Sequence, residues 1–70
     1  MSIYVEKPCI RLRACRANAG LTQQELADIL EVSANTINNW ESGATTPNSK
    51  VIHKISVITG VPEGLIFLPD

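Results

Sequence analysis

The sequence predicts a small all-α domain in which two short helices meet at a tight turn, and three observations support this fold class. Residues 22–25 form a capping box, in which a threonine hydroxyl and a glutamate carboxylate each accept from a backbone amide at a helix start. Ser33, a preferred N-cap residue, comes only three residues after Leu30, the last apolar residue of that helix. Glycine, the residue that commonly follows a helix end, stands after three helical patterns, at Gly20, Gly43 and Gly60.

The composition limits both the size of the core and the place where the protein works. Seventy residues allow one domain with a thin core, and with one Phe, one Tyr and one Trp that core must be mostly aliphatic. No apolar stretch reaches the length of about 18 residues that a membrane span needs, and the N-terminus lacks the pattern of a signal peptide. We therefore expect a cytoplasmic protein without a membrane partner.

An arm and two helices are expected in the first half of the chain. Residues 1–7 lack a helical pattern and are predicted to form an N-terminal arm, whereas residues 8–70 form the helical domain. The first helix is expected from Pro8, whose fixed φ suits a first turn, to Ala19. The second helix begins at the capping box and ends near Leu30. The side chains expected to face the core are Leu12, Cys15, Ala19, Leu26, Ile29 and Leu30.

Three further helices are expected in the second half. The third is capped by Ser33 and stops at Gly43. Ser49 is expected to cap the fourth helix, and a fifth, short helical turn is expected to open at residues 61–63 and run through residues 65–67 before Pro69. The side chains expected to face the core are Ile37, Trp40, Val51, Ile52, Ile55 and Ile58.

The outer face of the predicted third helix is made of polar residues. At about 100° per residue, Asn35 and Asn39 lie opposite Ile37, and Asn38, Thr36 and Ser42 lie beside them. Asparagine is a poor helix former, so a role other than helix stability is expected for this face. The paired donor and acceptor of the amide match the N6 and N7 edge of adenine in the major groove. The alternative is an ordinary solvated face.

Residues 10–66 resemble the lambda-repressor-like helix-turn-helix family of phage repressors, Cro proteins and related bacterial regulators. The positions that carry the resemblance are Arg16, residues 21–27, Val32, Ser33, Ile37, residues 40–43, Pro47 and residues 55–61. The resemblance implies a five-helix fold with the helix-turn-helix at helices 2 and 3. It also implies a double-stranded DNA operator as the partner, read by the helix that begins at Ser33.

The resemblance further implies roles for individual residues. Gln23 would touch a phosphate or a base at the edge of the half-site, and Ser42 and the following loop would hold the DNA backbone. Arg16 would pair with Glu41 and tie the first helix to the end of the third. The implied DNA-binding set is Gln23, Ser33, Ala34, Asn35, Thr36, Asn38, Asn39, Ser42 and Thr45. Ordinary surface roles remain the alternative for Gln23 and for the charges Arg11, Arg13, Lys50 and Lys54.

Two departures from the family pattern leave two mechanisms open. Glu31 stands where relatives frequently have Gly, so a residue with a Cβ is expected at positive φ. The loop of residues 43–47 has no Lys or Arg, and the formal net charge is −1, which is unusual for a partner of DNA. One mechanism is a Cro-like repressor that dimerises through residues 3–5 or 65–68 and binds an operator. The other is an antirepressor that binds a partner phage repressor.

The sequence offers no basis for an enzyme, a metal site or a cofactor. It contains no recognisable motif of paired carboxylates, no Ser or Cys nucleophile with a base, and no glycine loop that would cradle phosphates. His53 is the only histidine, and Cys9 and Cys15 are expected to be small buried apolar residues rather than metal ligands or a disulfide. No small-molecule substrate is expected.

Overall fold

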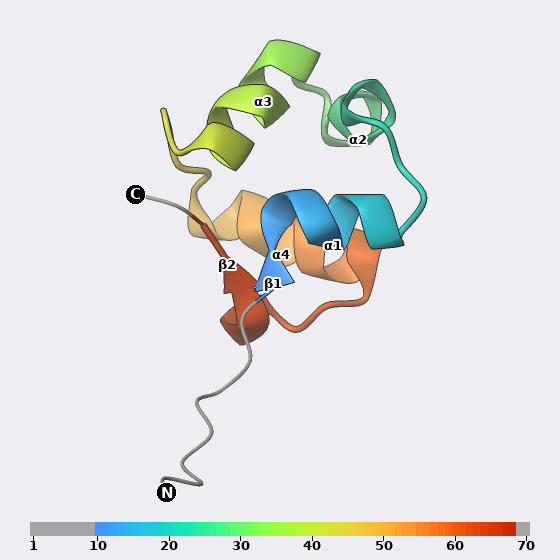
Figure 1. The fold of residues 1–70 in the computed structure, drawn as a ribbon, viewed down its shortest axis with the longest axis vertical. Helices are drawn as coiled ribbons and strands as arrows, with labels where there is room; N and C mark the ends of the chain where they lie inside the picture. The colour runs from blue at the N-terminus through green and yellow to red at the C-terminus, as the bar shows by residue number, and fades with distance from the viewer. Residues whose placement is uncertain (1–9, 69–70) are drawn as a thin grey trace, which may run out of the picture.

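The computed structural model describes residues 10–68. In chain order the elements are β1 (Ile10–Arg11), α1 (Leu12–Asn18), α2 (Gln23–Leu30), α3 (Ala34–Ser42), α4 (Ser49–Thr59), the 3₁₀ turn η1 (Glu63–Leu65) and β2 (Ile66–Phe67). Figure 1 shows α2 and α3 together at one end of the molecule, with α1 and α4 below them. The predicted helical class is confirmed, with four α-helices between residues 10 and 68 instead of five. The expected N-terminal arm lies outside the described residues.

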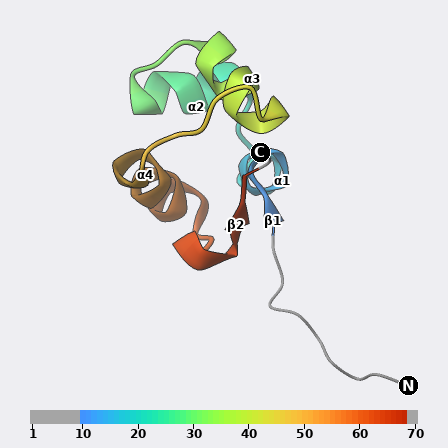
Figure 2. The same cartoon turned by 90° about the vertical axis from the view of Figure 1, so that its left-hand side faces the viewer.

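The structure corrects the predicted bounds of the first helix and of the last helical turn. The first helix begins at Leu12, because Ile10 and Arg11 pair in parallel with Ile66 and Phe67. The expected last helical turn is present as η1 but ends at Leu65, and Ile66 and Phe67 form β2 instead of continuing it. Figure 2 shows β1 and β2 side by side. Short apolar runs fit a helix and a strand equally well, and only the pairing between the two ends of the chain distinguishes them.

The core forms where the four helices meet. Each helix contributes one large, fully buried aliphatic side chain, with exposed fractions of 0 to 1%: Leu12, Leu26, Ile37 and Ile55. The predicted inward positions of Ile37 and Trp40 on α3 are confirmed. Burying these apolar surfaces supplies most of the stabilisation of a domain of this size.

Two side chains expected in the core lie at the surface. Ile29 is 53% exposed, while Ala27 is fully buried in its place. At about 100° per residue, Leu26, Ala27 and Leu30 share one side of α2. Ile29 points about 100° away from the centre of this buried side. Ala19 is exposed because α1 ends at Asn18 and the chain leaves the helix there.

Capping contacts explain where α2, α3 and α4 begin. The predicted box is present: Glu25 N donates to Thr22 Oγ1 at 3.0 Å, and Thr22 N donates to Glu25 Oε1 at 2.9 Å. Ser33 Oγ accepts from Thr36 N at 3.1 Å, as predicted. The N-cap of α4 is Asn48 rather than Ser49, because Asn48 Oδ1 accepts from Val51 N at 3.0 Å.

The turn between α2 and α3 requires a left-handed residue, and Glu31 takes this conformation with φ of 60°. Replacing Glu31 with glycine is expected to raise the free energy of unfolding by about 0.5 kcal/mol. The variant relieves a Cβ clash of roughly 1 kcal/mol and loses part of that gain through the greater freedom of glycine in the unfolded chain. Urea titrations followed by Trp40 fluorescence measure the change. Asp28→Gly, inside α2, is the matched control and should be destabilising; a Glu31→Gly variant less stable than the parent would contradict the argument.

Candidate nucleic-acid interface

The α3 helix presents a polar outer face on a rigid support. Ile37 and Trp40 are buried against the core, while Asn35 and Asn38 are exposed and Asn39 is partly exposed. Figure 1 shows α3 at the end of the molecule opposite β1 and β2, with α2 beside it. The helix is therefore fixed by its apolar side and open to a macromolecule on its asparagine side.

The structure brings the residues of the expected DNA-binding set to α3, the loop after it and the start of α2. The exposed members are Ser33, Asn35, Asn38, Ser42 and Thr45, and the partly exposed members are Gln23, Ala34, Thr36 and Asn39. Ala34 packs against the core, so only part of its surface is available to a ligand. The hydroxyls of Ser33 and Thr36 lie 2.9 Å apart and hydrogen-bond to each other.

Hydrogen bonds to one carbonyl hold the loop after α3. The backbone oxygen of Asn39 accepts from Ser42 Oγ at 3.2 Å and from Thr45 N at 3.3 Å. Gly43 closes the helix in the left-handed conformation with φ of 87°. The backbone that carries Ser42 and Thr45 is therefore ordered beside the asparagine face.

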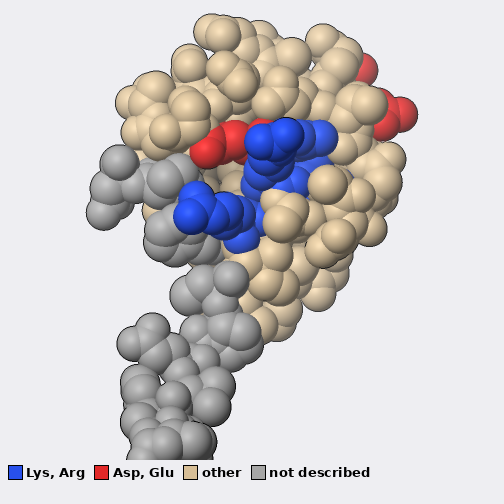
Figure 3. Space-filling view, in the orientation of Figure 1, with Lys and Arg blue, Asp and Glu red and all other residues tan. Residues whose placement is uncertain are grey.

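Charge is distributed unevenly over the molecule. Figure 3 shows a group of Lys and Arg side chains next to an acidic one, in the middle of the face in view. Among the described residues, neither α3 nor the loop of residues 43–48 that follows it contains Lys or Arg. Contacts of this surface with a polyanion must therefore depend on amides, hydroxyls and the arginines of α1.

A side-chain network joins α1, α2 and α3. Arg16 Nε donates to Glu41 Oε2 at 2.6 Å, Arg16 Nη2 to Glu41 Oε1 at 3.3 Å, and Arg16 Nη1 to the backbone oxygen of Leu21 at 2.7 Å. The two charged side chains are only 13% and 6% exposed. This is the pair that the family resemblance implies, and it ties the end of α1 to the end of α3.

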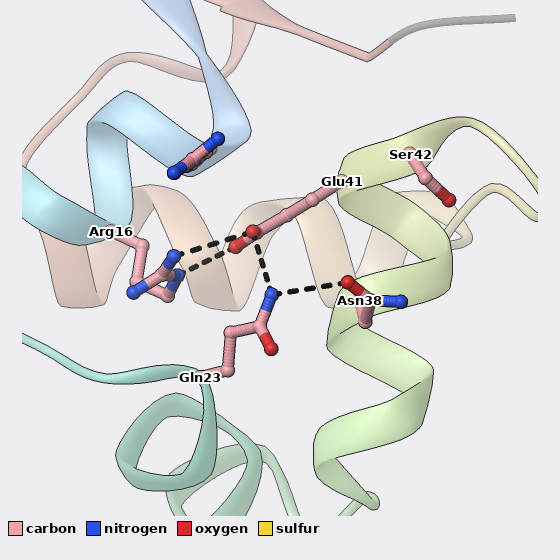
Figure 4. A pocket seen from close by; sticks show the side chains of 6 residues that line it. Arg16, Gln23, Asn38, Glu41 and Ser42 are labelled. Atoms are coloured by element: carbon pink, nitrogen blue, oxygen red, sulfur yellow. Dashed lines mark hydrogen bonds and ion pairs between the residues drawn. The ribbon is translucent and has the colours of Figure 1, made fainter.

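Gln23 belongs to the same network. Its Nε2 donates to Glu41 Oε1 at 3.0 Å and, at 3.5 Å, to Asn38 Oδ1 (Figure 4). Gln23, which is expected to touch a DNA phosphate or base, thus uses its amide nitrogen for contacts within the protein, one of them to Asn38 on the outer face of α3. The place of Gln23 at the edge of the interface was predicted from the sequence, but these contacts were not, since no local pattern links residues 15 or 18 positions apart.

The described residues contain little that suggests other chemistry. Between residues 10 and 68 no group of three or more His, Cys, Asp or Glu could hold a metal ion. Cys15 is fully buried, and burial raises the pKa of its thiol. None of the helices in this range is long and apolar enough to cross a bilayer.

Comparisons with known proteins agree with this architecture. A helix-turn-helix family model matches residues 12–66. A prophage-derived, uncharacterized HTH-type transcriptional regulator, YonR of Bacillus subtilis, is 37% identical over 51 residues, which cover 73% of this chain and 47% of YonR. A Yarrowia lipolytica protein with the provisional name multi-protein-binding factor 1 is 37% identical over 46 residues, which cover 66% of this chain and 30% of that protein.

The chain spans less than half the length of either of these relatives. No solved structure matches it significantly. The family match covers all four α-helices, including the capped turn between α2 and α3 and the asparagine face beyond it. The chain therefore belongs to the Cro/C1-type helix-turn-helix family.

Proposed function

We propose that this domain is a DNA-binding transcriptional regulator that reads an operator in double-stranded DNA through α3. The observation that carries the proposal is the asparagine face: Asn35, Asn38 and Asn39 lie on the side of α3 opposite the buried Ile37 and Trp40. Asparagine amides recognise adenine through paired hydrogen bonds at N6 and N7. The family and the name of the prophage relative support the same function.

In this function, base contacts and backbone contacts come from different parts of the interface. Ala34, Asn35, Thr36 and Asn39 face base edges in the major groove, while Ser42, Thr45 and the start of α2 at Gln23 lie along the DNA backbone. A homodimer would place two α3 helices in half-sites about 34 Å apart, one turn of the duplex. We assign the protein to the cytoplasm and to a repressor role in a phage lysis and lysogeny switch.

Base readout predicts a selective loss of affinity in Asn35→Ala. The variant should bind the operator about 5- to 150-fold more weakly, equivalent to about 1 to 3 kcal/mol, and bind random duplex nearly as well as the parent. Fluorescence anisotropy with the promoter next to the protein's own gene and with a scrambled duplex measures both affinities. Asn18→Ala, an exposed asparagine at the end of α1, is the matched control and should leave both unchanged. Equal losses on both duplexes would rule out base readout by Asn35.

A second candidate function is that of an antirepressor, which binds a partner phage repressor and alters its DNA binding. The observation that favours it is the charge: the formal net charge is −1, and the loop of residues 43–47 has no basic side chain. A near-neutral, slightly acidic domain is suited to a basic protein partner, toward which complementary charge would steer it. Tight operator binding by the purified protein alone, at low salt, would exclude this candidate.

A further inference from the structure

A polar pocket lies where α1 meets the start of α2 and the end of α3. It has a volume of about 460 Å³ and is lined by Arg13, Arg16, Gln23, Asn38, Glu41 and Ser42. Three of these residues, Gln23, Asn38 and Ser42, belong to the expected DNA-binding set, and Figure 4 shows them around the network of Arg16 and Glu41. The pocket therefore opens at the edge of the proposed DNA-binding surface.

The charges in this pocket leave one uncompensated cation. Arg16 and Glu41 neutralise each other at 2.6 Å, and Gln23 donates a further hydrogen bond to Glu41. Arg13 is exposed and has no hydrogen bond or ion pair within residues 10–68. The guanidinium of Arg13 thus carries the net positive charge of the pocket and keeps all its donors available for a ligand.

The other basic side chains lie elsewhere or are already engaged. Lys50, His53 and Lys54 are on α4 and line a different pocket with Ser49 and Glu63. Arg11 is in β1 and has an interaction of its own. Within residues 10–68, Arg13 is therefore the one basic side chain besides the paired Arg16 that shares a pocket with the residues beside the asparagine face.

We propose that this pocket holds one backbone phosphate of the bound duplex and that Arg13 is its cationic ligand. A guanidinium recognises phosphate with paired, charge-assisted hydrogen bonds, and the Asn38 and Ser42 side chains border the same space. The inference rests on the proposed function, and it supplies the phosphate contact that the loop of residues 43–47 lacks. In this arrangement α1 takes part in binding as well as supporting α3.

The test is the salt dependence of DNA binding by Arg13→Gln. Loss of one phosphate contact should weaken binding to operator and random duplex by the same factor and lower the slope of log affinity against log salt by about 1. That change makes the loss about three- to fourfold larger at 50 mM than at 200 mM salt. Lys54→Gln removes the same charge from α4 and should leave the slope near that of the parent. Arg13→Lys should keep most of the slope.

The possible outcomes separate the two proposals. If the parent binds the operator and Arg13→Gln and Lys54→Gln have equal slopes, the phosphate site is wrong and the proposed function stands. If Arg13→Gln loses affinity only for the operator, Arg13 contacts a base and the phosphate assignment is also wrong. If the parent binds no duplex at all, the proposed function fails and the phosphate site fails with it. Arg13→Gln should unfold at the same urea concentration as the parent, because the side chain is exposed and unpaired within the described residues.

Discussion

Replacing Arg16 with methionine is expected to lower the free energy of unfolding by about 3 kcal/mol. The variant leaves the Glu41 carboxylate, whose side chain is 6% exposed, without its cation, and leaves the backbone oxygen of Leu21 without its donor. A domain of seventy residues has a free energy of unfolding of about 4 to 10 kcal/mol in total. The loss is thus a large share of the stability, and urea unfolding followed by Trp40 fluorescence measures it.

Two controls test whether the effect of Arg16→Met comes from the burial of the Arg16–Glu41 pair or would follow from the loss of any ion pair. Glu63→Gln removes the negative charge from the contact between His53 and Glu63, whose side chains are 66% and 48% exposed, and should change stability by less than about 1 kcal/mol. The double variant Arg16→Met, Glu41→Met should recover much of the loss, because replacing both buried partners with apolar groups is often close to neutral. A loss in Arg16→Met as small as that in Glu63→Gln would mean that the network contributes little to stability.

Local signals in the sequence were sufficient to predict the central part of the fold. The capping box at Thr22 and the N-cap Ser33 are contacts within one turn, so residue type and spacing specify them directly. The positive φ of Glu31 was expected from the family resemblance, because relatives frequently have Gly at this position of the turn. The inward positions of Ile37 and Trp40 follow from helical periodicity.

The parts that could not be predicted depend on contacts between distant segments. The start of α1 at Leu12 is set by the pairing of Ile10 with Ile66, which lies at the other end of the chain. The surface position of Ile29 depends on which side of α2 meets the core, and an apolar residue alone does not specify this. Residue type likewise could not distinguish Arg13 from an ordinary surface arginine, because its pocket exists only after α1, α2 and α3 pack together.

Ile37→Ala is expected to lower the free energy of unfolding by about 2 to 5 kcal/mol, an effect comparable to that of Arg16→Met. Ile37 is fully buried on the inner side of α3, and truncating it leaves a cavity in the core that joins α3 to the other helices. Ile37→Val, at a cost of about 0.5 to 1.5 kcal/mol, stays measurable if Ile37→Ala does not fold. Asn38→Ala, on the outer side of the same helix, should change stability by less than about 0.5 kcal/mol.

DNA binding by these variants tests whether the two sides of α3 have separate roles. A protein that is only partly folded binds with an apparent affinity reduced by its folded fraction, and this factor is the same for every DNA sequence. Ile37→Val and Ile37→Ala should therefore keep the ratio of operator affinity to random-duplex affinity, whereas Asn35→Ala should lower that ratio without changing the unfolding curve. Anisotropy titrations together with urea titrations measure both quantities for each variant. A changed ratio in Ile37→Val would mean that packing beneath α3 also sets its specificity, and the outer side chains would then not discriminate on their own.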